Sequence, residues 1–128
     1  MHRNQADFTL TFRGLCDAAA NEAGDQEVRR LFANARDYDE WAQRWRTRLA
    51  RESVAPALRA EAMRQVNPRY IPRNHQIERI IQAAERDDFA PFEELSMVLS
   101  QPYLTQAADA YAEPPLPGER VLQTFCGT

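Results

Sequence analysis

The chain has 128 residues, a length that fits one domain and buries roughly two thirds of the surface of the unfolded polypeptide. Its composition of 44% hydrophobic and 27% charged residues is that of an ordinary globular protein, and a formal net charge of −3 gives no general attraction to polyanions or anionic lipids. We therefore expect no nucleic-acid partner and no membrane contact, and the lack of a hydrophobic leader in MHRNQADF predicts a cytoplasmic location.

Apolar residues recur at helical spacing through the first part of the chain. Three stripes repeat at intervals of three and four residues, so each lines one face of an amphipathic helix. They are Phe8, Phe12, Leu15, Cys16 and Ala19; Val28, Leu31, Phe32 and Ala35; and Tyr38, Trp41, Trp45 and Leu49. We expect these stripes to face a core, with both tryptophans inside it.

A fourth helix is predicted over residues 54–66. Ser53 is its expected amino-terminal cap, and Pro56 is tolerated in its first turn. The Asn67-Pro68 step ends this helix, because a proline disfavours helical geometry in the residue before it.

An extended connector follows, and its prolines restrict it to few conformations. Its polar side chains form the most motif-like group of the chain: Arg69, Tyr70, Arg73 and Asn74. Guanidinium and amide groups around a bent connector usually satisfy backbone carbonyls of neighbouring helices or of an adjoining domain. We therefore interpret these four residues as a docking motif, with direct contact to a nucleotide as the weaker alternative.

The next segment predicts two longer helices and a short one. Asn74 is the expected cap of the first, which ends near Asp87-Asp88, since acidic side chains oppose the dipole at a helix carboxyl end. Its stripe is Ile77, Ile80, Ile81 and Ala84. Pro91 begins the second helix. Its inward residues are Phe92, Leu95, Val98 and Leu99. Residues 103–112 then form the short helix.

Beyond Glu113 the chain becomes rich in proline, which favours an extended tail. Only Arg120 to Phe125 shows a weak strand-like alternation. The predicted fold is all-α, with six or seven amphipathic helices in an irregular bundle. Residues 1–112 form the helical domain, and residues 113–128 form the tail.

The two cysteines lie far apart and predict different roles. Cys126 stands third from the end in a polar tail, where a thiol is accessible, and we interpret it as a redox cysteine, with an idle surface thiol as the alternative. Cys16 lies within an apolar stripe and is expected to be buried. Neither belongs to a C-x-x-C pair, so no zinc site is predicted.

Other chemistry-bearing residues favour structural roles. The arginines around Trp45 are spaced four residues from Glu40 and Glu52, which pairs charges on a solvated helix face. Asp88-Phe89-Ala90 resembles the metal-binding tripeptide of kinases only superficially, because no strand context accompanies it. His75 is expected to be exposed or to cap a helix, and no catalytic residue or metal ligand is assigned.

Several segments resemble the carboxyl-terminal part of the selenoprotein O family. They are DFTLTFRGL at 7–15, LRAEAMRQVNP at 58–68, NPRYIPRNH at 67–75, AAERDDF at 83–89, PFEEL at 91–95, SQPY at 100–103 and QTFCGT at the end. The resemblance implies a pseudokinase-fold enzyme that transfers AMP from ATP, with magnesium, to protein hydroxyls. It also implies that Cys126 forms a redox-sensitive disulfide with a cysteine of the catalytic core, although Gln123 replaces the second member of a C-x-x-C pair.

The residues of a kinase-like nucleotide site are missing from this sequence. All 16 basic residues are arginine, whereas such a site uses a lysine and a glycine-rich loop to hold phosphates. The four glycines are too far apart to form that loop. We therefore expect no cofactor for this chain alone.

The leading hypothesis is a carboxyl-terminal helical fragment of a selenoprotein O-like protein adenylyltransferase, either a truncated product or an excised piece, that is inactive alone. It would brace the missing catalytic core and present Cys126, and its uncovered apolar surface would favour self-association. The alternative is a free-standing α-helical module that binds another protein. An autonomous enzyme is the third hypothesis and ranks last.

Overall fold

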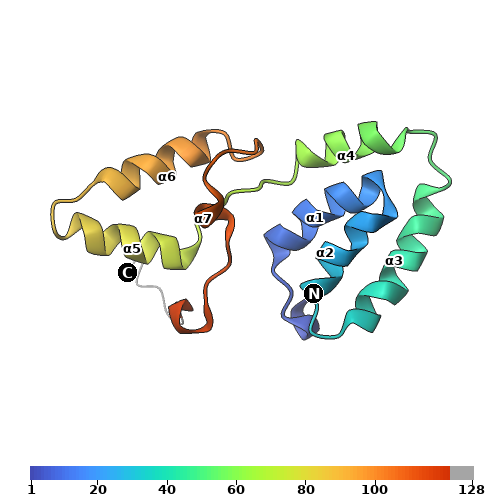
Figure 1. The fold of residues 1–128 in the computed structure, drawn as a ribbon, viewed down its shortest axis with the longest axis horizontal. Helices are drawn as coiled ribbons and strands as arrows, with labels where there is room; N and C mark the ends of the chain where they lie inside the picture. Colours follow the sequence, from blue (N-terminus) through green and yellow to red (C-terminus); the bar gives the residue numbers. More distant parts are fainter. Residues whose placement is uncertain (122–128) are drawn as a thin grey trace. The chain divides into compact units, whose positions relative to one another are not determined.

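The computed structural model describes residues 1–121. The chain divides into two compact units, the first from Met1 to Arg69 and the second beginning at Tyr70. This boundary falls inside the range 1–112, which the sequence analysis treated as one helical domain. The described residues form seven α-helices and no strand, so the all-α prediction is confirmed (Figure 1). Within them, no helix combines the length and apolar character needed to cross a bilayer.

Four α-helices build the first unit. They are α1 (Phe8–Ala20), α2 (Asp25–Arg30), α3 (Ala35–Leu49) and α4 (Pro56–Arg64), with short 3-10 turns at His2–Asn4 and Glu22–Gly24. Helix α1 contacts both α2 and α4, and α2 contacts α3. The carboxylate of Asp7 caps α1 by accepting from the N–H of Leu10 at 2.8 Å, and Asn34 caps α3 in the same way.

Two helix limits in this unit differ from the prediction. Helix α2 ends at Arg30 instead of continuing to Ala35, because the N–H of Leu31 bonds to the carbonyl three residues earlier and Asn34 then starts the next helix. Helix α4 begins at Pro56, and Ser53 does not cap it. A proline supplies the fixed backbone angle of a first helical position without needing a donor, so the helix starts there.

The core of the first unit is small and partly aromatic. Its buried residues are Leu15, Ala18, Val28, Tyr38 and Ala42, with Phe12, Phe32, Trp45 and Met63 packed around them. The prediction that both tryptophans lie in the core was wrong for Trp41, which is 37% exposed. Trp41 instead stacks on Trp45, with 5.2 Å between ring centroids, because the unit is too small to enclose both rings.

Long side chains satisfy the carbonyl groups at the ends of these helices. The guanidinium of Arg13 donates to the carbonyls of Arg64 and Asn67 at 3.2 and 2.9 Å, at the end of α4. The guanidinium of Arg59 donates to the carbonyl of Leu49 at 3.3 Å, at the end of α3. The last carbonyls of a helix have no partner within it, so each of these contacts fixes the end of one helix to a neighbouring helix.

The carboxylate of Asp25 connects three elements of the first unit. It accepts from the hydroxyl of Tyr38 at 2.5 Å and from two nitrogens of Arg46 at 2.9 and 2.5 Å. Arg46 also donates to the carbonyl of Ala18 near the end of α1, at 3.0 Å. Burial and the adjacent carboxylate raise the pKa of Tyr38, so its hydroxyl stays a donor. The network therefore holds α1, α2 and α3 together.

We predict that Asp25→Ala lowers the free energy of unfolding by about 2 kcal/mol, because it leaves a largely buried guanidinium and hydroxyl without their acceptor. Denaturant unfolding followed by circular dichroism measures the change. The matched control is Asp39→Ala, which removes an ion pair with Arg29 whose side chains are 48% and 51% exposed. Its expected effect is below about 0.5 kcal/mol, and equal losses in the two variants would contradict the assignment.

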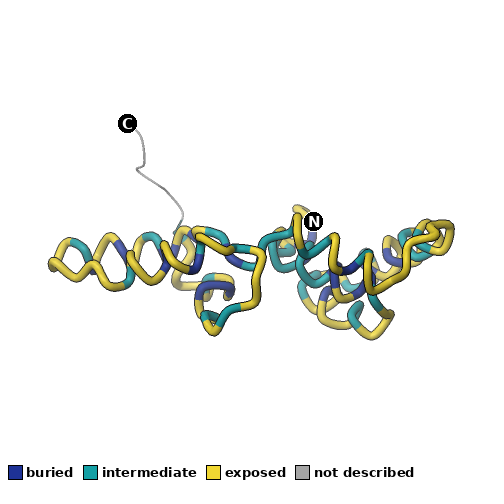
Figure 2. Tube along the Cα trace, turned by 90° about the horizontal axis from the view of Figure 1, so that it is seen from above, coloured by how far each residue is buried: buried dark blue, intermediate teal, exposed yellow. Residues whose placement is uncertain are grey.

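The second unit is a helical hairpin with one short helix against it. Its elements are α5 (Asn74–Ala84), α6 (Ala90–Ser100) and α7 (Asp109–Ala112), followed by a 3-10 turn at Pro117–Glu119. The buried residues are Tyr70, Ile80, Leu95, Val98, Tyr111 and Ala112, with Ile77, Leu99 and Ala108 beside them. Figure 2 shows how buried, intermediate and exposed residues alternate along these helices.

The predicted limits of α5 and α6 are close to those observed, with two corrections. Asn74 is the first residue of α5 rather than its cap, and no side chain caps this end. Helix α5 ends before Asp87, which adopts the left-handed conformation at φ 61°, and the N–H of Asp88 bonds back to the carbonyl of Ala83 at 3.1 Å. Phe92 was expected to face inward and is 56% exposed, because Leu95 and Val98 fill the inner face of α6.

The helix predicted over residues 103–112 forms only from Asp109 to Ala112. Gln106 uses its side-chain amide to donate to the carbonyls of Val98 and Gln101, each at 2.9 Å, at the end of α6. The hydroxyl of Tyr70 donates to the carbonyl of Gln106 at 3.0 Å and accepts from its N–H at 3.1 Å. These bonds replace the helical ones in this segment. The weak strand pattern was predicted for Arg120 to Phe125. Arg120 and Val121 form no strand, and the other residues of this range lie outside the described part of the chain.

Candidate functional site

The connector brings its four polar residues to different environments. Arg69 closes the first unit, while the other three begin the second. Tyr70 is 1% exposed and belongs to the core of the second unit, where its N–H donates to the carbonyl of Pro102 at 3.2 Å. Arg73 is 7% exposed, and Asn74 is exposed at the start of α5. Tyr70 therefore contributes its ring and hydroxyl to the fold, and Arg73 and Asn74 reach a cavity.

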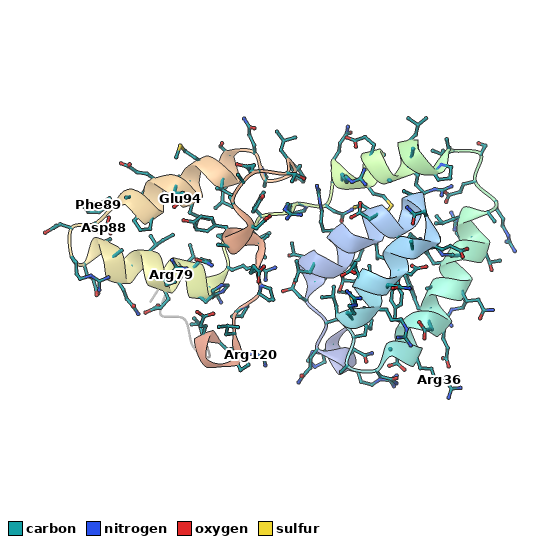
Figure 3. The ribbon with its side chains drawn as sticks, viewed as in Figure 1. Arg36, Arg79, Asp88, Phe89, Glu94 and Arg120 are labelled. Atoms are coloured by element: carbon teal, nitrogen blue, oxygen red, sulfur yellow. The ribbon has the colours of Figure 1, made fainter. Side chains whose placement is uncertain are left out.

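This cavity, here called the basic cavity, lies at the amino end of α5 and has a volume of about 460 Å³. The residues that line it include Ile71, Pro72, Arg73, Asn74, His75 and Arg120. Two arginines and a histidine thus face one hollow, and none of the described lining residues carries a carboxylate. Figure 3 labels Arg120, which follows the 3-10 turn at Pro117–Glu119. The local chemistry suits a negatively charged group.

His75 is the most unusual residue of the basic cavity. It was expected to be exposed or to cap a helix, and it is instead only 7% exposed. Burial lowers its pKa; the Glu119 carboxylate opposes this shift, and the positive charges of Arg73 and Arg79 add to it. Its Nε2 lies 3.2 Å from the side-chain nitrogen of Gln76, and its Nδ1 has no hydrogen-bond partner among the described residues.

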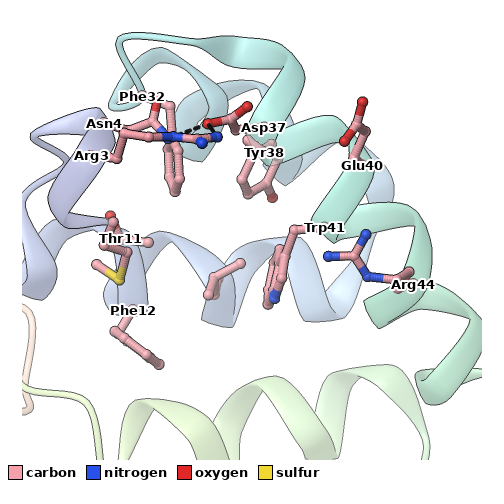
Figure 4. Close-up of a pocket in the computed structure, with 12 residues that line it drawn as sticks. Arg3, Asn4, Thr11, Phe12, Phe32, Asp37, Tyr38, Glu40, Trp41 and Arg44 are labelled. Atoms are coloured by element: carbon pink, nitrogen blue, oxygen red, sulfur yellow. Dashed lines mark hydrogen bonds and ion pairs between the residues drawn. The ribbon is translucent and has the colours of Figure 1, made fainter.

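The first unit contains a second cavity, of about 520 Å³, here called the aromatic cavity. Its wall includes the rings of Phe12, Phe32, Tyr38 and Trp41, as Figure 4 shows. The rings of Phe32 and Tyr38 lie 5.3 Å apart, and those of Tyr38 and Trp41 lie 5.9 Å apart. Such a lining suits a flat or branched apolar group.

The polar residues at the rim of the aromatic cavity are mostly paired with each other. Asp37 accepts from Arg3 at 2.6 Å and from Asn4 at 2.8 Å, and the hydrogen bond from Arg3 lowers the pKa of Asp37. Asn4 is buried, and its side-chain oxygen accepts from the N–H of Asn34 at 2.9 Å, which ties the start of the chain to α3. The rim of the aromatic cavity is therefore held in place by hydrogen bonds and an ion pair between its own residues.

The structure confirms one of the two cysteine predictions. Cys16 is fully buried, and its thiol donates to the carbonyl of Phe12 at 3.3 Å. Burial raises the pKa of the Cys16 thiol, so it is a poor nucleophile. Cys126 lies outside the described residues, and its redox role stays a prediction.

We predict that a thiol reagent such as dithionitrobenzoate reacts with the folded chain in two phases. Cys126 reacts fast, and Cys16 reacts at least about a thousandfold more slowly, because its modification waits for local opening of α1. Stopped-flow absorbance measures both phases. In the variant Cys126→Ser the fast phase is lost, and in the matched variant Cys16→Ser it is retained. Fast modification of both thiols in the native chain would refute the prediction.

Several charged motifs of the sequence lie on exposed helix faces or in turns. Arg48 pairs with Glu52 at 3.8 Å, as the four-residue spacing predicted, whereas Glu40 pairs with Arg36 at 3.0 Å. Asp88 and Phe89 of the kinase-like tripeptide are exposed in the turn between α5 and α6, and its third residue, Ala90, begins α6 (Figure 3). Within residues 1–121 no cluster of three or more potential metal ligands occurs.

Both cavities were missed from the sequence. Arg120 lies 45 positions beyond His75, and no rule of residue spacing predicts a contact between residues that far apart in the sequence. For the aromatic cavity, the stripe at Tyr38 and Trp41 was recognised but assigned to a sealed core. The available signal was the number of aromatic side chains in so short a unit, because a small interior cannot enclose all of their rings.

Comparison with known proteins gives consistent matches over this chain. The family model for protein adenylyltransferase SelO matches residues 1–100. Protein nucleotidyltransferase YdiU of Bradyrhizobium sp. strain BTAi1 is 63% identical over 126 residues, which are 97% of this chain and 26% of that protein. Proteins of the same name from Rhodopseudomonas palustris strain CGA009 and Nitrobacter hamburgensis are 57% and 55% identical, over 98% and 100% of this chain and 26% of each relative. The chain thus spans about a quarter of the length of these curated relatives.

Proposed function

Because this chain belongs to the protein adenylyltransferase SelO family, as its resemblance to selenoprotein O predicted, we propose that it is the helical carboxyl-terminal portion of a protein nucleotidyltransferase. In the intact protein, AMP passes from ATP to serine, threonine or tyrosine hydroxyls of protein substrates, with magnesium. This portion is inactive alone, and it braces the catalytic core. The absence of lysine and of a glycine-rich loop supports this division of roles.

The observation that carries the bracing role is an uncovered apolar face on the second unit. Helix α7 covers one side of the α5–α6 hairpin, where Gln76 donates to the carbonyl of Ala110 at 3.0 Å and Tyr111 donates to Glu94 at 2.9 Å. Successive residues of an α-helix are rotated by about 100° around the helix axis. Around α5, Ile81 is therefore about 140° from Gln76, and around α6, Phe92 is about 160° from Glu94. Both therefore point to the side opposite α7, and they are 45% and 56% exposed.

We call this surface the open face, formed by the exposed side chains of Ile81 and Phe92. Its occupant in our proposal is the catalytic core, which corresponds to the roughly three quarters of the relatives that this chain does not match. An aromatic ring flanked by aliphatic side chains is the usual centre of a stable protein contact. Arg69, Arg73 and Asn74 are proposed to add polar contacts to the same core.

Cys126 is proposed to act as a redox latch on the same core. Its thiol and a core thiol would lose two electrons and two protons to an oxidised thiol pool and form a disulfide, which locks the helical portion in place. Reduction would release it. The buried, high-pKa Cys16 is unsuited to this role, which leaves Cys126 as the available thiol.

We predict that the isolated chain transfers no label from radiolabelled ATP to protein, and that it restores transfer by a YdiU relative from which the matching quarter has been deleted. In this assay Phe92→Asp raises the chain concentration for half-maximal activity by about 30-fold, equivalent to about 2 kcal/mol for a central aromatic contact. The control is Met97→Asp, since Met97 is 66% exposed on another side of α6. Label transfer by the chain alone would overturn the proposal.

We also predict that the open face drives weak self-association when the core is absent. Sedimentation equilibrium should show an average mass that rises with protein concentration, because exposed apolar patches associate. The Phe92→Asp variant should remain monomeric, whereas Met97→Asp should behave like the parent chain. A parent chain that stays monomeric at every concentration would contradict this expectation.

The competing function is a free-standing α-helical module that binds another protein. It is favoured by one observation: each unit closes around buried residues of its own. Trp45 packs against the first core, and Leu99 packs against the second core, in which Ile80 is buried. The complementation assay separates the two proposals, because a free-standing module restores no activity to the deleted relative.

A further inference from the structure

The aromatic cavity of the first unit presents a mainly apolar interior. The hydroxyl of Tyr38 donates to Asp25 at 2.5 Å, so Tyr38 offers the cavity its ring. Thr11 is 3% exposed, and its hydroxyl donates to the carbonyl of Asp7 at 2.6 Å. Both hydroxyl groups among the described lining residues are thus engaged, and a ligand meets mainly ring and aliphatic surface.

The size of this cavity and the exposure of one of its rings suit a further ring. Its volume of about 520 Å³ lies within the range of small-molecule sites, roughly 300 to 1,000 Å³. Trp41 is 37% exposed although it stacks on Trp45. Aromatic side chains gain from burial and from packing against other rings, so a ring seated beside Trp41 would be stabilised in both ways.

A second and independent observation is the charge at the mouth of the aromatic cavity. The carboxylates of Asp37 and Glu40 each pair with an arginine, at 2.6 and 3.0 Å. Arg44 also lines the cavity and is exposed, and within residues 1–121 it makes no ion pair or side-chain hydrogen bond. It follows Trp41 by three residues on α3, and Figure 4 shows its guanidinium directed toward that ring. The mouth therefore carries an available positive charge.

From this arrangement we infer that the aromatic cavity binds a small aromatic carboxylate, with the ring of the ligand beside Tyr38 and Trp41 and its carboxylate paired with Arg44. A planar guanidinium can donate to both oxygens of a carboxylate, which fixes the orientation of the ligand. An aromatic ammonium ion would need a free carboxylate, and both carboxylates of the described lining already pair with arginines. The site lies within the first unit and does not depend on the proposed role of the open face.

The test uses the full chain labelled with ¹⁵N and phenylpropionate as the probe, at constant ionic strength set by sodium chloride. We expect a saturable shift of the Trp41 indole N–H signal, with a dissociation constant of about 1 mM, an ordinary value for a ligand with so few atoms. The variant Arg44→Gln should weaken binding about fivefold, because an exposed ion pair contributes modestly. The matched variant Arg51→Gln replaces another exposed arginine, one outside the cavity, and should bind like the parent.

Two analogues test the two halves of the ligand. Phenethylammonium keeps the aromatic ring and reverses the charge, and cyclohexylpropionate keeps the charge without a ring that can stack. Both should bind more weakly than phenylpropionate. A shift that stays linear with phenylpropionate, an equal loss in Arg44→Gln and Arg51→Gln, or equal or tighter binding of either analogue would overturn the proposal. Because Arg44 is exposed and lies outside the core cluster, its replacement leaves the core of the unit intact.

Discussion

The short length of the helices is the constraint on which both units depend. The described α-helices contain between 4 and 15 residues, so a large share of their carbonyl groups lies in a final turn without an internal donor. The side chains of Arg13, Arg46 and Arg59 donate to such carbonyl groups in the first unit, and the side chain of Gln106 does so in the second. Arginine presents five donors in a rigid fork, which gives a physical reason for a chain whose basic residues are all arginine.

Local patterns in the sequence predicted the elements, and distant contacts decided their limits. The stripes at Phe8 and Ile77 gave helices α1 and α5 close to their observed ranges, since helical spacing is a local property. The early end of α2, the short α7 and the exposure of Phe92 depend on partners elsewhere in the chain. The same reason explains which site residues could be predicted. The connector motif was visible in the sequence, whereas only the folded structure shows that His75 and Arg120 line one cavity.

The two surfaces of the second unit suit different kinds of contact. The open face on α5 and α6 offers apolar side chains, and its proposed role is to rest against the catalytic core of a SelO-family protein. The basic cavity at the start of α5 offers charge and backbone donors. Helix α5 contributes residues to both surfaces.

The anchoring of Asn4 has a practical consequence for anyone who handles this protein. Met1 lines the aromatic cavity, and Asn4 is fastened to Asn34 and Asp37 only three positions later. Any peptide joined ahead of Met1 therefore emerges beside the rings of Phe32 and Trp41, with little slack to swing away. An affinity handle at that end would shield the hollow and quench or shift tryptophan fluorescence, so immobilisation is better done from the opposite terminus.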